Sequence, residues 1–256
     1  MATKAFSFLS VLFRSTLGVI CQASSVIGLI VLFVDKPWAV YVALSFVCLS
    51  LILFVVAFLY LVSKRAENKY PEGFKRIASF CFYRTEDCEN ITCTTKRIIQ
   101  SKSLCLSEIE HKFKWTGRRL PEVTAGKHKV VSKVTANNSG DYDFDVAKIK
   151  LAEPLLYDES SVICVKTVVN DSDQVSKPFL GTMVEHPVGH LVFSILLGYK
   201  PDSFTEPATL HRKKLKCDLA EFEFVEEIPF DTKHKRYYAE YENPEIGYLY
   251  KIEWKR

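Results

Sequence analysis

The pattern of hydrophobic and polar positions divides the chain into two parts near residue 62. Two stretches near the N-terminus, 15–34 and 38–62, contain no charged residue. A helix rises about 1.5 Å per residue, so about 20 residues cross a hydrocarbon core roughly 30 Å thick. A segment in lipid must also satisfy its own backbone hydrogen bonds, which favours a helix. The pattern therefore predicts two membrane-spanning helices.

The link between the two stretches is Asp35-Lys36-Pro37, which is too short to hold a domain. Residues 1–62 are therefore expected to form a transmembrane α-helical hairpin. Pro37 cannot continue the first helix but suits the first turn of the second. A cleaved signal peptide would have a shorter apolar core and a small-residue cleavage site. A buried hairpin of a soluble protein would need polar positions that reach water, which these stretches lack.

After residue 74 the hydrophobic period changes to two residues, which is the period of a β-strand with one wet face. Ile91, Cys93, Thr95, Arg97 and Ile99 alternate in this way with more polar neighbours. Turn-forming residues separate such runs at roughly 8–12-residue intervals, which is typical of a sandwich or barrel. The expected strands cover 91–99, 108–115, 127–135, 142–151, 161–169, 179–184, 190–197, 219–225, 236–241 and 248–254.

These patterns predict three segments. Residues 1–62 form the two-helix transmembrane hairpin, and 63–74 form a linker in which Pro71 and Gly73 act as helix breakers. Residues 75–256 form an all-β cytoplasmic domain, which we expect to be sandwich-like.

Charge predicts the orientation of the hairpin. Lys4 and Arg14 precede it and several cations follow it, whereas Lys36 is the single cation in its turn. Cations that flank membrane helices remain on the cytoplasmic side. The sequence thus predicts a multi-pass protein of the inner membrane, if the source is a bacterium, with both termini in the cytoplasm. The cations after the hairpin are Lys64, Arg65, Lys69, Lys75 and Arg76.

The charge balance argues against a nucleic-acid-binding surface. The chain has 34 Lys and Arg against 30 Asp and Glu, a net charge of +4. No basic run dominates either part, whereas nucleic-acid binding usually needs a basic face or stripe. The 8 cysteines are irregularly spaced and do not resemble the disulfide framework of a secreted domain.

Small residues recur at helical spacing in the expected membrane helices. Ser24 with Gly28, and Ala39 with Ala43, are pairs that let helices approach closely in lipid. They either pack the hairpin against itself or support a homo-oligomer. Gln22 is the side chain that could hydrogen-bond across helices or line a pore.

Motifs of catalysis are missing from the sequence. It contains no Gly-rich phosphate loop, no Gly-x-Ser-x-Gly and no His-Glu-x-x-His. We therefore expect no enzyme activity, no catalytic residues and no cofactor. Cys81, Cys88, Cys93 and Cys105 are spaced less regularly than zinc ligands, so no metal site is expected.

A cluster of cations near Trp115 is the candidate ligand or partner surface. Arg118 and Arg119 follow the tryptophan closely, and Lys112 and Lys114 precede it. Cations beside an aromatic ring can bind a phosphate-bearing ligand or lipid headgroups. The alternative is an ordinary solvated loop, since short charge runs are common on surfaces.

The layout resembles the two-transmembrane effectors of bacterial anti-phage systems, and most of all a retron transmembrane effector. The features that carry the resemblance are the hairpin at 15–62, the run Phe113-Lys114-Trp115-Thr116-Gly117 and the closing segment 243–250 with Trp254. The resemblance covers the whole chain as architecture. It carries over no catalytic residues.

The resemblance implies abortive infection. Such an effector is held inactive by a reverse transcriptase and its small hybrid nucleic acid, and on phage attack it is released to damage the inner membrane. Two other functions stay open. One is a membrane-tethered sensor of a cyclic oligonucleotide, another signalling nucleotide or a protein partner, with no toxicity of its own. The other is a membrane-anchored enzyme.

Overall fold

The computed structural model describes residues 37–134, 144–215 and 221–256. The chain forms two units, residues 1–65 and 66–256, and each is described by itself. The predicted membrane residues Gln22, Ser24 and Gly28 lie outside the described residues.

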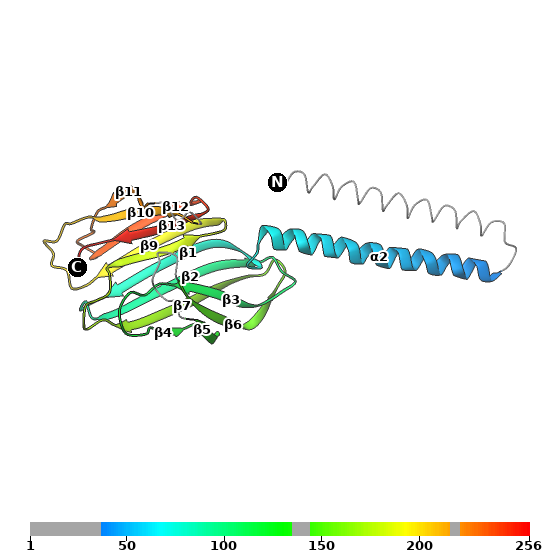
Figure 1. Ribbon diagram of the computed structural model, residues 1–256, viewed down its shortest axis with the longest axis horizontal. Helices are drawn as coiled ribbons and strands as arrows, with labels where there is room; N and C mark the ends of the chain where they lie inside the picture. The colour runs from blue at the N-terminus through cyan, green and yellow to red at the C-terminus, as the bar shows by residue number, and fades with distance from the viewer. Residues whose placement is uncertain (1–36, 135–143, 216–220) are drawn as a thin grey trace. The chain divides into compact units, whose positions relative to one another are not determined.

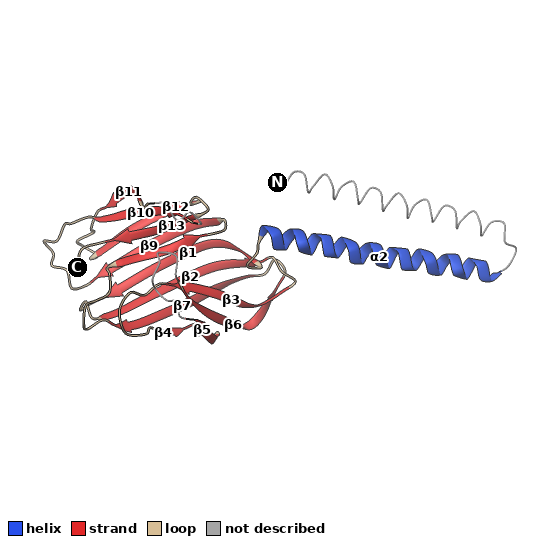
Figure 2. Ribbon diagram, in the orientation of Figure 1, coloured by secondary structure: helices blue, strands red, loops and turns tan. Residues whose placement is uncertain are grey.

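The described part of the first unit is helix α2, Pro37–Lys69, whose last residues belong to the second unit (Figure 2). Its apolar stretch Val40–Val62 has 23 residues, and none of it is buried. At 1.5 Å per residue this stretch is about 35 Å long, enough to cross a hydrocarbon core of roughly 30 Å. It is the one helix in the described ranges that is long and apolar enough to do so. The described residues thus include one candidate membrane span. The two-helix hairpin stays a prediction.

Most of the expected linker is helical, because α2 continues to Lys69. Residues 63–69 contain neither Gly nor Pro, so nothing in them stops the helix. The helix ends before Pro71, which disfavours a helical conformation at the preceding residue. The backbone then turns, with the Gly73 amide donating to the Tyr70 carbonyl at 2.8 Å and Gly73 at φ +77°. The non-helical connection is thus shorter than predicted.

The second unit is built from β-strands, which confirms the prediction of a β-rich domain (Figure 1). The prediction missed strands β1, β4 and β10. The strands are β1 (Phe74–Thr85), β2 (Asn90–Ser101), β3 (Cys105–Phe113), β4 (Glu122–Thr124), β5 (Lys129–Val134), β6 (Asp145–Leu156), β7 (Ser160–Asn170), β8 (Phe179–Val184), β9 (Val188–Leu197), β10 (Ala208–Lys214), β11 (Glu223–Ile228), β12 (Arg236–Glu242) and β13 (Tyr248–Glu253).

The strands form three sheets. A 6-stranded sheet has the order β12-β9-β1-β2-β7-β4, a 4-stranded sheet the order β11-β10-β13-β8, and a 3-stranded sheet the order β3-β6-β5. Strands β1 and β9 pair in parallel, and the other ladders between the described strands are antiparallel.

The large sheet packs against both smaller sheets. One hydrophobic cluster joins Phe193 and Tyr237 of the large sheet to Leu210 of the 4-stranded sheet. A second cluster joins Ile99 of the large sheet to Ile149 of the 3-stranded sheet. The large sheet is therefore one layer of a β-sandwich, and the two smaller sheets share the opposite layer.

Candidate functional site

A cavity of about 70 Å³ lies inside the β-sandwich, where the opposite layer is divided. Strands β1, β2 and β7 of the large sheet line one side of it. Strand β8 and strand β3 with the segment after it line the other side. Strands β3 and β8 belong to different sheets and are not hydrogen-bonded to each other. The cavity therefore occupies the gap between the edges of the two smaller sheets.

Arg97 reaches this cavity from the buried face of β2. The alternation predicted for residues 91–99 puts Arg97 on the same face as Ile91 and Ile99, and all three side chains are buried in the structure. The Arg97 Nη1 donates a hydrogen bond to the Glu110 carbonyl at 3.1 Å. The Arg97 Nε has no partner. A charged side chain thus lies in the interior with one of its donors unsatisfied.

Electrostatics at Arg97 are unfavourable to its charge. Burial, and next the positive charge of Arg76, lower the pKa of Arg97 to about 10. The guanidinium still carries its proton at neutral pH. Arg76 forms an ion pair with Glu72. Among the described residues no carboxylate forms an ion pair with Arg97.

His111 lies in β3 on the opposite side of the cavity. Its side chain is buried, its Nδ1 has no partner, and its ring stacks on Phe113 with centroids 5.8 Å apart. Burial, followed by the charges of Arg97 and Arg76, holds the pKa of His111 well below its ordinary value. The imidazole is therefore neutral at physiological pH. A neutral imidazole has one donor and one acceptor nitrogen.

Trp115 supplies a further buried donor, because its Nε1–H has no partner. The backbone of Gly117 lies directly against the indole. A Cβ built at Gly117 would come within 2.5 Å of the Trp115 ring. The glycine of the Trp115-Thr116-Gly117 run thus permits this close approach, which any side chain would prevent.

The lining of the cavity carries no acidic side chain. Its two cysteines, Cys81 and Cys93, are thiols at neutral pH because burial raises the pKa of each, that of Cys93 to about 12. Lys112 and Lys177 also line it, and Lys112 pairs with Glu185 at 2.7 Å. The lining therefore presents donors and positive charge, and its thiols are neutral.

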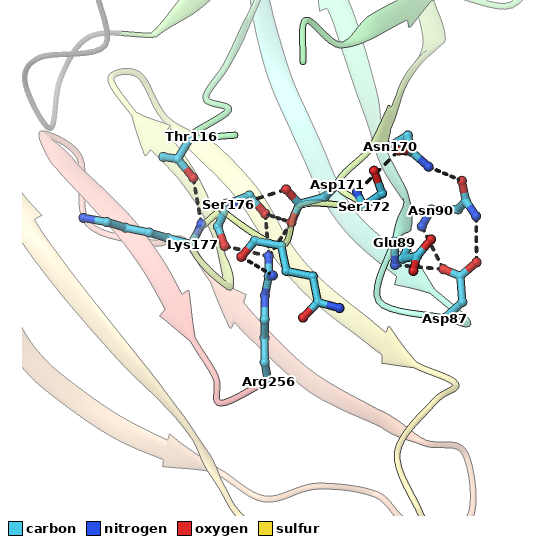
Figure 3. A network of polar contacts seen from close by, with 11 residues as sticks. Asp87, Glu89, Asn90, Thr116, Asn170, Asp171, Ser172, Ser176, Lys177 and Arg256 are labelled. Atoms are coloured by element: carbon cyan, nitrogen blue, oxygen red, sulfur yellow. Dashed lines mark hydrogen bonds and ion pairs between the residues drawn. The ribbon is translucent and has the colours of Figure 1, made fainter. Parts of the chain in front are cut away.

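A polar network fixes the loop that carries Lys177 (Figure 3). The buried carboxylate of Asp171 accepts from the Ser176 hydroxyl at 2.6 Å and from Arg256 Nη2 at 2.5 Å. Burial alone would raise the pKa of Asp171, but these hydrogen bonds outweigh it and the pKa lies below its ordinary value. The Lys177 amide then donates to Thr116 Oγ1 at 2.9 Å, which ties the loop to the cavity wall.

The structure separates the residues of the predicted ligand surface. Trp115 lines the cavity, whereas Arg118 and Arg119 are exposed and do not line it. Arg119 donates to Asn170 Oδ1 instead. The sequence analysis did not assign Arg97 or His111 to a site. The signal that could have pointed to Arg97 is an arginine on the same face of an alternating strand as Ile91 and Ile99.

The other expected features can be placed only in part. Ala39 and Ala43 lie one turn apart in α2. Their side chains lie outside the described part of the structure. Cys81 is buried whereas Cys105 is exposed. No group of three or more His, Cys, Asp or Glu in the described ranges could hold a metal ion.

Comparisons with known proteins reveal no family. No family model matches the chain, and no curated protein matches it. An M1 zinc metallopeptidase from Deinococcus radiodurans aligns with 70% of this chain and 42% of its own, at 11% identity and a TM-score of 0.31. The chain thus spans less than half the length of that structure. Baculovirus P35 aligns with 73% of this chain and 99% of its own, at 9% identity and a TM-score of 0.36.

Proposed function

We propose that the protein is a membrane-bound effector of anti-phage defence, of the retron type, that impairs the inner membrane when it is activated. The observation that carries this proposal is the stretch Val40–Val62 of α2, which is apolar and wholly unburied. A helix that is apolar on all sides needs either a protein interior or a bilayer around it. The described residues supply no protein interior for this helix, which leaves a bilayer as its surroundings. In this proposal the bilayer is also where the effector acts.

The finer parts of the proposal extend this observation. Residues 15–34 supply a second span, so that the chain crosses the membrane twice and both termini lie in the cytoplasm. The hairpins associate as a homo-oligomer. The β-sandwich receives the activating event, from a reverse transcriptase–hybrid nucleic acid complex in the retron scheme.

Expression of the full chain alone in a bacterial host tests the proposal. We expect growth arrest and entry of a membrane-impermeant dye. Ile52→Arg puts a charge at the middle of α2, which costs about 2.5–3.5 kcal/mol at a helix centre in lipid, and should abolish both effects. The matched control is Val162→Arg, because Val162 is 56% exposed on strand β7 of the soluble unit.

Two results would contradict the effector proposal. One is a chain that accumulates in the membrane without harm to the host. The other is an Ile52→Arg variant that remains as toxic as the Val162→Arg control at equal protein level.

A second candidate function is a membrane-tethered sensor without toxicity of its own. The cavity lined by Arg97, His111 and Trp115 favours it, because buried unsatisfied donors are uncommon in folded proteins and often mark a missing partner. This candidate predicts a harmless full chain whose β domain binds a small ligand. The dye-entry experiment therefore separates the two functions.

A further inference from the structure

We infer that the cavity between β2, β3 and β8 binds a phosphoryl group, carried either by inorganic phosphate or by a nucleoside monophosphate. The inference deepens the proposed function and rests on it for the role of the β domain as receiver. The site itself is argued from the cavity alone.

Three polar atoms around the cavity have no partner: Arg97 Nε, Trp115 Nε1 and His111 Nδ1. The first two can only donate, and the third donates in one tautomer of the ring. A buried donor left without an acceptor costs about 1–3 kcal/mol, so a ligand that supplies acceptors to these atoms is stabilised by about that much for each one it satisfies. The donors come from β2, from β3 and from the segment after β3. A ligand with several acceptor oxygens can satisfy them together.

The charge of Arg97 decides between water and an anion as the ligand. Water could accept hydrogen bonds from these donors, but it would leave a buried guanidinium without a counter-charge. The cavity lining contains no Asp or Glu, and Lys177 adds positive charge to it. Glu185 neutralises Lys112 from outside the lining. Glu72 offsets part of the Arg97 charge but forms its ion pair with Arg76, so an anion in the cavity would supply the direct counter-charge that Arg97 lacks.

The shape of the donor set favours a tetrahedral oxyanion. A guanidinium is planar and binds phosphate or carboxylate oxygens with two parallel hydrogen bonds. A carboxylate has only two oxygens, whereas a phosphoryl group has three or four, enough to serve donors that come from β2, from β3 and from the segment after β3. A volume of about 70 Å³ holds such a group but not a whole nucleotide. The sugar and base of a nucleotide would therefore lie outside, on the side of the exposed Lys177.

Calorimetry and thermal unfolding of the full chain in detergent micelles test the inference. The titrants are inorganic phosphate and AMP, with sodium chloride at equal ionic strength as the control. We expect phosphate or AMP, but not chloride, to raise the melting temperature. The preferred titrant identifies the source of the phosphoryl group. Tighter binding of phosphate indicates the free anion, and tighter binding of AMP indicates a nucleotide.

Two variants and a control locate the site. Trp115→Phe keeps an aromatic side chain but removes the indole N–H, and should raise the dissociation constant about 10-fold or more. Arg97→Gln should abolish binding. Without ligand it should melt no lower than the wild type, because it removes a buried charge that forms no ion pair with a carboxylate. Arg118→Gln, an exposed arginine three residues from Trp115, should bind as the wild type does.

The inference is overturned if neither titrant stabilises the wild type beyond the chloride control. It is also overturned if Trp115→Phe binds as tightly as the wild type, a result that does not depend on how well Arg97→Gln folds. The two proposals fail separately. Failed binding leaves the growth arrest of the effector untouched, and absence of toxicity leaves the binding measurements unaffected.

Discussion

At the scale of single residues, Arg97 and His111 are both buried, but Arg97 is charged at neutral pH whereas His111 is neutral. Arg97 keeps its proton although burial lowers its pKa to about 10. His111 loses its proton because the desolvated imidazole also lies near the charges of Arg97 and Arg76. One cavity thus holds a cation and a neutral imidazole at physiological pH.

His111 should make the stability of the protein depend on pH. An unfolded histidine takes up a proton near its ordinary pKa of 6.5, whereas the folded His111 does so only at much lower pH. The unfolded state therefore binds more protons below pH 6.5, and stability falls as the pH drops through that value. The loss is at most about 1.4 kcal/mol per pH unit.

Urea unfolding of the full chain in detergent at pH 7.5, 6.5 and 5.5 measures this dependence. His111→Gln cannot take up the proton, so its free energy of unfolding should fall less steeply between pH 6.5 and 5.5. The other histidines act equally in both proteins. Parallel pH profiles for the wild type and the variant would contradict a neutral, buried His111.

At the scale of elements, β10 shows how tertiary packing changes the interpretation of a charged run. Residues 208–214 are not among the strands expected from the sequence, and they include the charged run His211-Arg212-Lys213-Lys214. In the structure β10 pairs with β11 on one side and with β13 on the other. Cations of β10 lie over aromatic rings. The Arg212 guanidinium lies 4.6 Å from the centroid of the Tyr248 ring.

Leucine truncations test whether β10 is a core strand. Leu210 is fully buried between the layers, and Leu210→Ala should lower the free energy of unfolding by about 2–5 kcal/mol. Leu104→Ala is the matched control, because Leu104 is 74% exposed and should change stability by no more than about 0.5 kcal/mol. Chemical denaturation of both variants measures the difference. Equal stabilities would place β10 outside the core.

Local patterns predicted elements better than they predicted the site. Alternation placed Arg97 on the inner face of its strand, and Pro71 and Gly73 marked the end of the helix within a few residues. The cavity depends on which strands face each other. Strand β3 lies opposite β2 through packing between two sheets, and no local pattern records that pairing. Trp115 was identified because cations lie on both sides of it in the sequence.

At the scale of the whole molecule, the chain divides near residue 65 into a unit that contains most of α2 and a unit built from β-strands. If α2 is a membrane span, the intact chain should sediment with membranes at high speed and resist extraction at alkaline pH. Immunoblotting of the pellet and supernatant after lysis without detergent measures this. Recovery of the intact chain in the supernatant would contradict both membrane functions proposed above. Deletion of residues 15–62 should move the protein to the supernatant.

The parallel ladder between β1 and β9 has a consequence for biosynthesis. Strand β1 follows α2 after a short turn, yet Arg76 lies opposite Val188, more than a hundred residues later. Ribosomes add about 5–20 residues per second, so β1 waits roughly 5–20 s for this neighbour. Contacts so distant in sequence also form slowly. If α2 is a membrane span, it can therefore enter the membrane while the sandwich is still an open chain, so that insertion precedes closure of the β domain.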